Sequence, residues 1–223
     1  MNTPVYSVST TARPTSATMN RVLRNTYLLL SMTLLFSATM AGVSMTLNWP
    51  HPGLIITLVG YFGLLFAVHK TAHSAMGLVW VFALTGFMGY TLGPIIGAYL
   101  QFVPDGHAVV TNAFAITAVT FVGLSVYAVK SGRRFSAMGG FLFVGILTAF
   151  LLGLVAVFFH MPALSLAVSG MFVLLMAGLI LYQTGEIVNG GEDNYILATV
   201  TLYVSVYNLF TSLLHLLGVA GEE

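Results

Sequence analysis

The sequence predicts an all-α integral membrane protein, a bundle of seven transmembrane helices with its N-terminus in the cytoplasm. Three observations lead to this prediction. Of the 223 residues, 58% are hydrophobic and only 6% are charged, against about 25% charged residues in soluble domains. Seven apolar stretches follow one another, and a spanning helix takes about 20 such residues. The basic residues all fall on one side of the resulting topology.

The composition also excludes several classes of protein. So few charges cannot cover the surface of a soluble enzyme. The chain has no cysteine, which excludes disulfides, thiol catalysis and cysteine-ligated metals. A net charge of +1 gives no reason to expect a nucleic-acid partner. We therefore expect the lipid bilayer to surround most of the chain.

The chain opens with a polar stretch that is typical of a flexible tail. Residues 1–20 are rich in Ser and Thr and contain Pro4 and Pro14. The apolar stretch that follows runs unbroken to residue 47, which is too long for the apolar core of a signal peptide. We predict a flexible cytoplasmic tail over 1–25 and a first spanning helix over 26–47.

Six further spans complete a predicted membrane domain that covers residues 26–218. Short segments with Pro, Gly or charged residues separate them, and the fifth and sixth are so close that they must form a tight hairpin. Residues 219–223 remain as a short C-terminus on the non-cytoplasmic side. The six spans are expected at 54–68, 74–100, 111–129, 139–159, 164–183 and 196–217.

The Lys and Arg residues give an independent check of this topology. Three lie in the tail, one in the second loop and three in the fourth loop, and these segments share one side of the membrane. The loops 48–53, 101–110 and 160–163 contain neither Lys nor Arg. Because cytoplasmic loops are enriched in basic residues, the N-terminus is expected in the cytoplasm. The basic residues are Arg13, Arg21, Arg24, Lys70, Lys130, Arg133 and Arg134.

The third span contains the segment GFMGYTLGPIIGAYL, in which Gly89, Gly93 and Gly97 recur every four residues. This spacing places three small residues on one helix face, where a neighbouring backbone can approach closely. Pro94 removes one backbone hydrogen bond and is expected to kink the helix. The pattern favours tight packing with a kink, and its alternative interpretation is a hinge beside a cavity.

The seventh span carries a stripe of polar residues at steps of 4, 3, 4 and 3, which keeps them on one face. Facing lipid, these groups would have no partners, so we place this helix at or near the centre of the bundle. The stripe is interpreted as interhelical hydrogen bonding worth about 0.6 kcal/mol per contact, or as the polar lining of a gated path. The last member is expected to be an interfacial histidine. The members are Thr201, Ser205, Asn208, Ser212 and His215.

Other candidates for chemistry are weak. No charged residue falls at the centre of a predicted span, which argues against a proton-coupled pump, and the only lysines lie in loops, which excludes a retinal protein. His69 and His73 have a spacing that suits a metal, but no third ligand is near. We therefore predict no catalytic residues, no metal site and no cofactor, and we do not expect an enzyme.

The third-span segment and the segment LYVSVYNLF, within residues 182–218, resemble the Bax-inhibitor (transmembrane Bax-inhibitor-motif) family. The similarity is greatest to the bacterial YccA-type branch and covers essentially the whole chain. It implies a seven-helix bundle in the bacterial cytoplasmic (inner) membrane, with the last helix wrapped by the other six.

The resemblance implies two functions, of which the first fits the residues poorly. Some members of the family are pH-sensitive calcium leak channels that use a pair of aspartates. The matching positions here are Gln183 and Ser205, which can neither titrate nor supply anionic oxygens to calcium. Glu186, one turn beyond Gln183, could supply a single carboxylate near the cytoplasmic mouth.

The second implied function is an interaction with a protease. Members of the YccA-type branch associate with the ATP-dependent membrane protease FtsH and modulate its turnover of membrane proteins. We therefore expect a non-enzymatic modulator of FtsH in quality control or stress response, with a calcium or cation leak channel or transporter as the alternative. The tail, with Met1, Asn2, Arg13 and Arg21, is expected to contact the protease. The polar-core candidates are Gln183, Glu186, Thr201, Ser205, Asn208 and Ser212.

Overall fold

The computed structural model describes residues 16–221, so Met1, Asn2 and Arg13 of the expected protease contact lie outside the described residues. Residues 16–221 form seven helices and contain no strand. Each helix is long and apolar enough to cross a membrane, which confirms the predicted all-α bundle of seven spans. The helices are α1 Ser16–Thr46, α2 Leu54–Thr71, α3 Met76–Phe102, α4 Gly106–Ser131, α5 Met138–Phe158, α6 Pro162–Asn189 and α7 Tyr195–Ala220.

Two helix boundaries differ from the expected ones by six residues or more. Residues 16–25, which we expected in the tail, are helical. The prediction missed them because hydropathy marks only the apolar part of a helix, and this helix continues beyond that part. Val22 and Leu23 in this stretch pack against the core. Helix α6 continues six residues past its expected end at 183, as far as Asn189. It ends at Gly190, whose φ of 75° suits glycine at a helix terminus.

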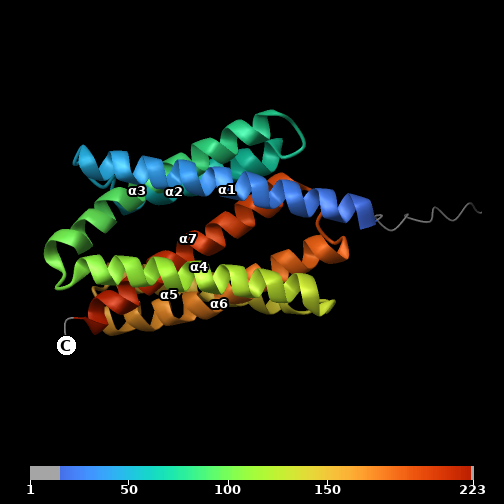
Figure 1. Ribbon diagram of the computed structural model, residues 1–223. Helices are drawn as coiled ribbons and strands as arrows, with labels where there is room; N and C mark the ends of the chain where they lie inside the picture. The colour runs from blue at the N-terminus through green and yellow to red at the C-terminus, as the bar shows by residue number, and fades with distance from the viewer. Residues whose placement is uncertain (1–15, 222–223) are drawn as a thin grey trace, which may run out of the picture.

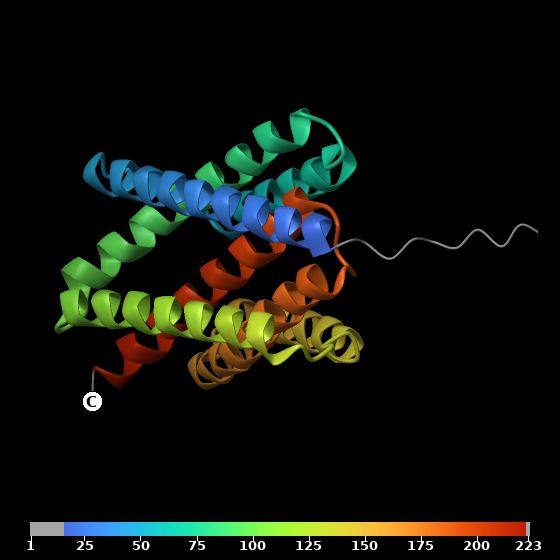
Figure 2. The same ribbon diagram turned by 45° about the vertical axis from the view of Figure 1, so that its right-hand side comes forward.

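Figures 1 and 2 show α1, α2 and α3 on one side of the bundle and α4, α5 and α6 on the other, with α7 running obliquely between them. Helix α7 packs against α1, α3, α4 and α6. It is the most buried of the seven helices, whereas α2 is the least buried. The expectation that all six other helices wrap α7 stays a prediction, since close packing is established for these four.

The described Lys and Arg residues all lie at one end of the bundle, which we call the basic end. They occupy the start of α1, the end of α2, the end of α4 and the loop that follows α4. This arrangement follows from the alternating directions of the seven helices. The side of the membrane on which the basic end lies stays a prediction. The residues are Arg21, Arg24, Lys70, Lys130, Arg133 and Arg134.

Helices α1 and α3 approach each other closely at two glycines of α3. A Cβ atom on Gly93 would come within 2.5 Å of the carbonyl oxygen of Ala41, and one on Gly89 would meet the carbonyl oxygen of Ser37 still more closely. Gly97 is less constrained, because a Cβ there would lie 3.5 Å from the side chain of Met45. Backbone contact between the two helices therefore depends on Gly89 and Gly93.

Helix α3 runs without a break through Pro94. Proline has no N–H, so the carbonyl of Tyr90, one turn earlier, has no helical hydrogen-bond donor. The hydroxyl of Ser44 on α1 donates to this carbonyl oxygen at 2.9 Å. Because a carbonyl left unpaired at membrane depth is costly, the contact between α1 and α3 supplies the hydrogen bond that Pro94 removes.

This arrangement predicts an energetic coupling between Ser44 and Pro94. Ser44→Ala should lower the free energy of unfolding by about 1 kcal/mol, because the Tyr90 carbonyl loses its donor. In a Pro94→Ala background the new N–H of residue 94 can donate to that carbonyl, so the same Ser44→Ala change should cost close to nothing. Thermal unfolding of the four proteins in detergent forms a double-mutant cycle that measures the coupling. An equal cost in both backgrounds would contradict it.

Candidate functional site

The polar stripe of α7 lies inside the protein, and none of its five members is exposed. Much of its hydrogen bonding is local, however. Ser205 donates its hydroxyl to the carbonyl oxygen of Thr201 at 2.7 Å, and Asn208 donates through Nδ2 to the carbonyl oxygen of Val204 at 2.8 Å. These bonds fall within one turn of the same helix, so the stripe does not form a continuous network between helices.

Gln183 and Ser205 are not joined by a hydrogen bond. Gln183 is buried on α6, and its amide nitrogen has no partner within residues 16–221. The Ser205 hydroxyl is bonded to its own helix. Both groups are neutral, so this part of the interior offers hydrogen bonding but no charge to an ion.

Polar groups from several helices lie at the same end of the bundle as Gln183. The Tyr27 hydroxyl of α1 lies 3.2 Å from Oγ1 of Thr184 on α6. The Thr199 hydroxyl of α7 donates to the carbonyl oxygen of Thr26 at 3.2 Å. These bonds connect α1, α6 and α7 in the half of the bundle nearest the basic end. The hydroxyls of Thr26 and Ser125, like the Gln183 amide nitrogen, have no partner among the described residues.

The other half of the bundle contains a crevice of about 310 Å³ between α2, α5, α6 and α7. We call it the polar crevice. One side is apolar, with Leu58, Phe150 and Phe172. The other side is polar, and none of the described residues that line the crevice is charged. The polar side brings together Asn208 and Ser212, which the sequence singled out, with Ser165, Ser169 and Thr211, which it did not.

His215 adjoins the polar crevice through Ser169. The Nδ1 atom of His215 lies 2.8 Å from the hydroxyl of Ser169, which also donates to the carbonyl oxygen of Ser165 at 3.1 Å. Thr211 donates to the carbonyl oxygen of Tyr207 at 3.1 Å. The hydroxyls of Ser169 and Thr211 are thus already engaged within the protein.

Helix α7 has a second polar face that the sequence pattern did not predict. Tyr203 is only 1% exposed, and its hydroxyl lies 2.7 Å from that of Ser37 on α1 and donates to the carbonyl oxygen of Thr85 on α3 at 3.3 Å. One turn later, the Tyr207 hydroxyl lies 3.2 Å from Oγ1 of Thr91. These contacts hold α7 against α1 and α3. The sequence signal for this face was the pair of tyrosines, which lie four residues apart in the most polar span.

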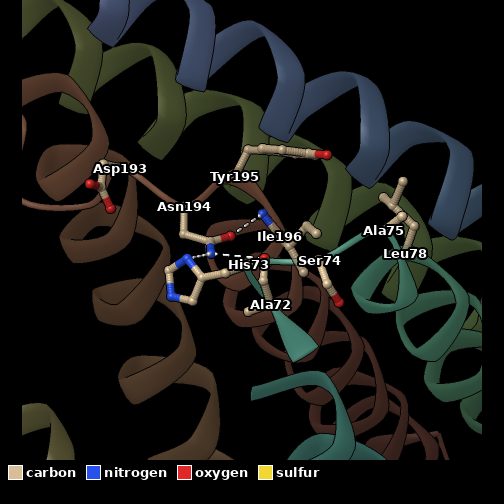
Figure 3. Close-up of a pocket in the computed structure, with 9 residues that line it drawn as sticks. All are labelled: Ala72, His73, Ser74, Ala75, Leu78, Asp193, Asn194, Tyr195 and Ile196. Carbon is tan, nitrogen blue, oxygen red and sulfur yellow. Dashed lines mark hydrogen bonds between the residues drawn. The ribbon is translucent and has the colours of Figure 1, made fainter. Parts of the chain in front are cut away.

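At the basic end, Asn194 joins two loops beside a pocket of about 430 Å³ (Figure 3). Its Oδ1 accepts hydrogen bonds from the backbone N–H groups of Ile196 at 2.9 Å and Leu197 at 3.2 Å, which caps α7. Its Nδ2 donates to the carbonyl oxygen of Ala72 at 3.0 Å, and His73 lies beside it. Asn194 therefore links the loop between α2 and α3 to the start of α7.

Glu186 lies on the last turns of α6 and is half-buried. Its carbonyl oxygen accepts from the N–H of Gly191 at 2.8 Å, and its carboxylate folds against the same glycine. His69 bonds through Nδ1 to the carbonyl oxygen of Leu65 at 2.9 Å. The described part of the chain contains no group of three His, Asp or Glu side chains that could hold a metal ion.

The comparisons with known proteins agree with one another. The family described as "Inhibitor of apoptosis-promoting Bax1" matches residues 19–222. An uncharacterized protein of Pseudomonas aeruginosa is 50% identical over 202 residues, which are 91% of this chain and 90% of that protein. "Modulator of FtsH protease YccA" of Escherichia coli K12 is 48% identical over 205 residues, 92% of each chain.

A protein named "Inner membrane protein YccA", from Escherichia coli O6:H1, matches with the same identity of 48% and the same coverage of 92%. Together with the seven apolar helices, this relative identifies a multi-pass protein of the inner membrane. The matched residues include both segments that carried the resemblance, the third span and the region from α6 to α7. The chain belongs to the Bax inhibitor family.

Proposed function

We propose that this protein binds the ATP-dependent membrane protease FtsH and modulates its activity, in membrane-protein quality control or the stress response, and is not itself an enzyme. The observation that carries the proposal is the identity of 48%, over 92% of both chains, with the relative named as a modulator of this protease. The identity between the two proteins extends over nearly their whole length. Such identity is stronger support for a shared partner than a shared fold alone would be.

The interior of the bundle supports a scaffold rather than an ion path. The two positions that the resemblance matches to the aspartates of the leak channels are Gln183 and Ser205, which are neutral. The buried hydroxyls of Tyr203 and Ser44 bond neighbouring helices, as groups that tighten a bundle do. A tightly packed bundle resists extraction from the membrane, so a protease that engages it is occupied for longer.

For the contact itself we propose the N-terminal residues before α1, together with the exposed Arg21 at the basic end. The proposed orientation, with the N-terminus in the cytoplasm, puts these residues on the side from which an ATP-driven protease would pull. Residues 1–15 precede the first turn of α1. They can therefore be removed without cutting into the helix.

Deleting residues 2–15 is expected to abolish association with FtsH and to slow degradation of the protein at least about tenfold, since the protease loses its starting segment. Co-purification and the degradation rate in proteoliposomes measure both effects. The matched control keeps the same fourteen residues in shuffled order and should still be degraded if composition suffices. A folded deletion variant that binds FtsH as well as the full chain would overturn the proposal.

The alternative function is a calcium or cation leak through the polar interior, along Thr201, Asn208 and Ser212, with Glu186 at the mouth. Calcium flux through the purified protein in liposomes separates the two. We expect flat traces at about pH 6 and about pH 8, a range in which carboxylates with raised pKa values and histidines titrate, because no acidic pair is present at Gln183 and Ser205. A clear pH-dependent flux would favour the leak channel.

A further inference from the structure

We propose that the polar crevice binds a neutral amphiphile with a carbonyl-bearing headgroup that dissolves in the interior of the bilayer, such as a membrane quinone. The inference does not depend on the proposed interaction with FtsH. It rests on hydrogen-bonding groups in the crevice that the protein itself leaves unpaired, on the absence of charge in the described lining, and on the depth of Asn208 in the bundle.

Two side chains in the crevice have hydrogen-bonding groups that are not paired within the described residues. Ser212 is 8% exposed and lines the crevice, and its hydroxyl makes no hydrogen bond within residues 16–221. Asn208 donates one N–H to the Val204 carbonyl and keeps its second N–H and its side-chain carbonyl. Because the two residues are one turn apart on α7, both can reach the same headgroup.

The chemistry of these groups selects the ligand. The Ser212 hydroxyl and the second N–H of Asn208 are donors, and a carbonyl oxygen accepts from both. An ionised ligand would be left without a counter-charge in a site of low polarity, which is costly. Ser169 and Thr211 contribute little to ligand binding, because their hydroxyls are already bonded to other groups of the protein.

The depth of the site indicates where the ligand comes from. Asn208 lies near the middle of α7, Tyr195–Ala220, so this donor sits near the mid-depth of the span, and Ser212 lies one turn nearer the end of the helix. Phospholipid headgroups stay at the membrane surface, whereas a small neutral ring can partition into the interior. The apolar side, with Phe150 and Phe172, suits a flat ring. A volume of about 310 Å³ is at the small end of ligand sites, about 300–1,000 Å³.

The geometry allows access from the lipid, since α2 forms one wall of the crevice. This helix is the least buried of the seven and packs mainly against α3. Its contact with α5 includes one edge-to-face ring pair, Phe62 with Phe150, at 5.7 Å between ring centroids. A ligand can therefore enter sideways between α2 and α5 without disturbing the α7 contacts with α1 and α3.

The experiment compares two probes on the unaltered protein in lipid nanodiscs. Decylubiquinone carries ring carbonyls, and decylbenzene has the same alkyl chain on a ring without them. We expect saturating decylubiquinone to raise the thermal unfolding midpoint by about 4 °C and decylbenzene to leave it nearly unchanged. Equal shifts with both probes, or no shift with either, would overturn the proposal.

Variants then test the donors. Ser212→Val and Asn208→Leu should each weaken decylubiquinone binding at least about tenfold. Thr211→Val is the matched control, because Thr211 also lines the crevice but its hydroxyl is bonded to the backbone, so this variant should keep the shift. Retention of the full shift in both Ser212→Val and Asn208→Leu would contradict the assignment, and so would its loss in Thr211→Val alone.

Discussion

Gly89→Ala is expected to lower the free energy of unfolding by about 3 kcal/mol or more. A Cβ at this position would overlap the backbone carbonyl oxygen of Ser37. Backbone cannot move aside by changing a rotamer, so α1 and α3 would have to separate along their contact. That separation would also lengthen the hydrogen bond from Ser44 to the Tyr90 carbonyl. The measurement is thermal unfolding in detergent. It is detected as the fraction of protein that still elutes as folded material.

The matched control is Gly42→Ala on α1. A Cβ on Gly42 would have no atom within 4 Å, and alanine is the better helix former by up to about 1 kcal/mol. The control should therefore unfold at the same temperature as the original protein or slightly higher. If Gly89→Ala matched this control, close backbone contact at Gly89 could not be what holds α1 and α3 together.

Tyr203→Ala is expected to be at least as damaging, with a loss of about 3–5 kcal/mol in the free energy of unfolding. The ring is 1% exposed and lies where α7 meets α1 and α3, so its removal leaves a cavity between three helices. It also removes the hydroxyl that contacts Ser37 and the Thr85 carbonyl. Thermal unfolding of the purified variant measures the loss.

Tyr203→Phe separates the contribution of the hydroxyl to stability from that of the ring. It should cost about 0.6 kcal/mol, the average for hydrogen bonds between transmembrane helices, and no more than about 1.7 kcal/mol, the largest such value. Combined with Ser37→Ala, it should cost less than the sum of the two single changes, since both remove the same bond. Strict additivity would mean that the Tyr203–Ser37 contact contributes nothing to stability.

The spans could be predicted from the sequence because each is a long apolar stretch between short polar segments. Their ends could not, since a helix continues until a residue such as Gly190, with a φ of 75°, stops it. Hydropathy therefore placed Glu186 in a loop, although it lies on the last turns of α6. The helical start of α1 at Ser16 was missed for the same reason.

The candidate site was only partly visible in the sequence. Steps of three and four residues revealed the stripe with Asn208 and Ser212, because periodicity within one helix is a local property. Tyr203 was missed because its ring resembles an apolar residue and its partner Ser37 is 166 positions away. The polar crevice could not be found in this way either, since four different helices enclose it.

The long separation between Ser37 and Tyr203 has a consequence for biosynthesis. Ribosomes add about 5–20 residues per second, so the Ser37 hydroxyl is made on the order of ten to thirty seconds before the tyrosine 166 residues later that pairs with it. During this interval α1 and α3 can already pack against each other, but their contacts with α7 cannot yet form. The contacts of Tyr203 with α1 and α3 therefore form only after the last helix has been made.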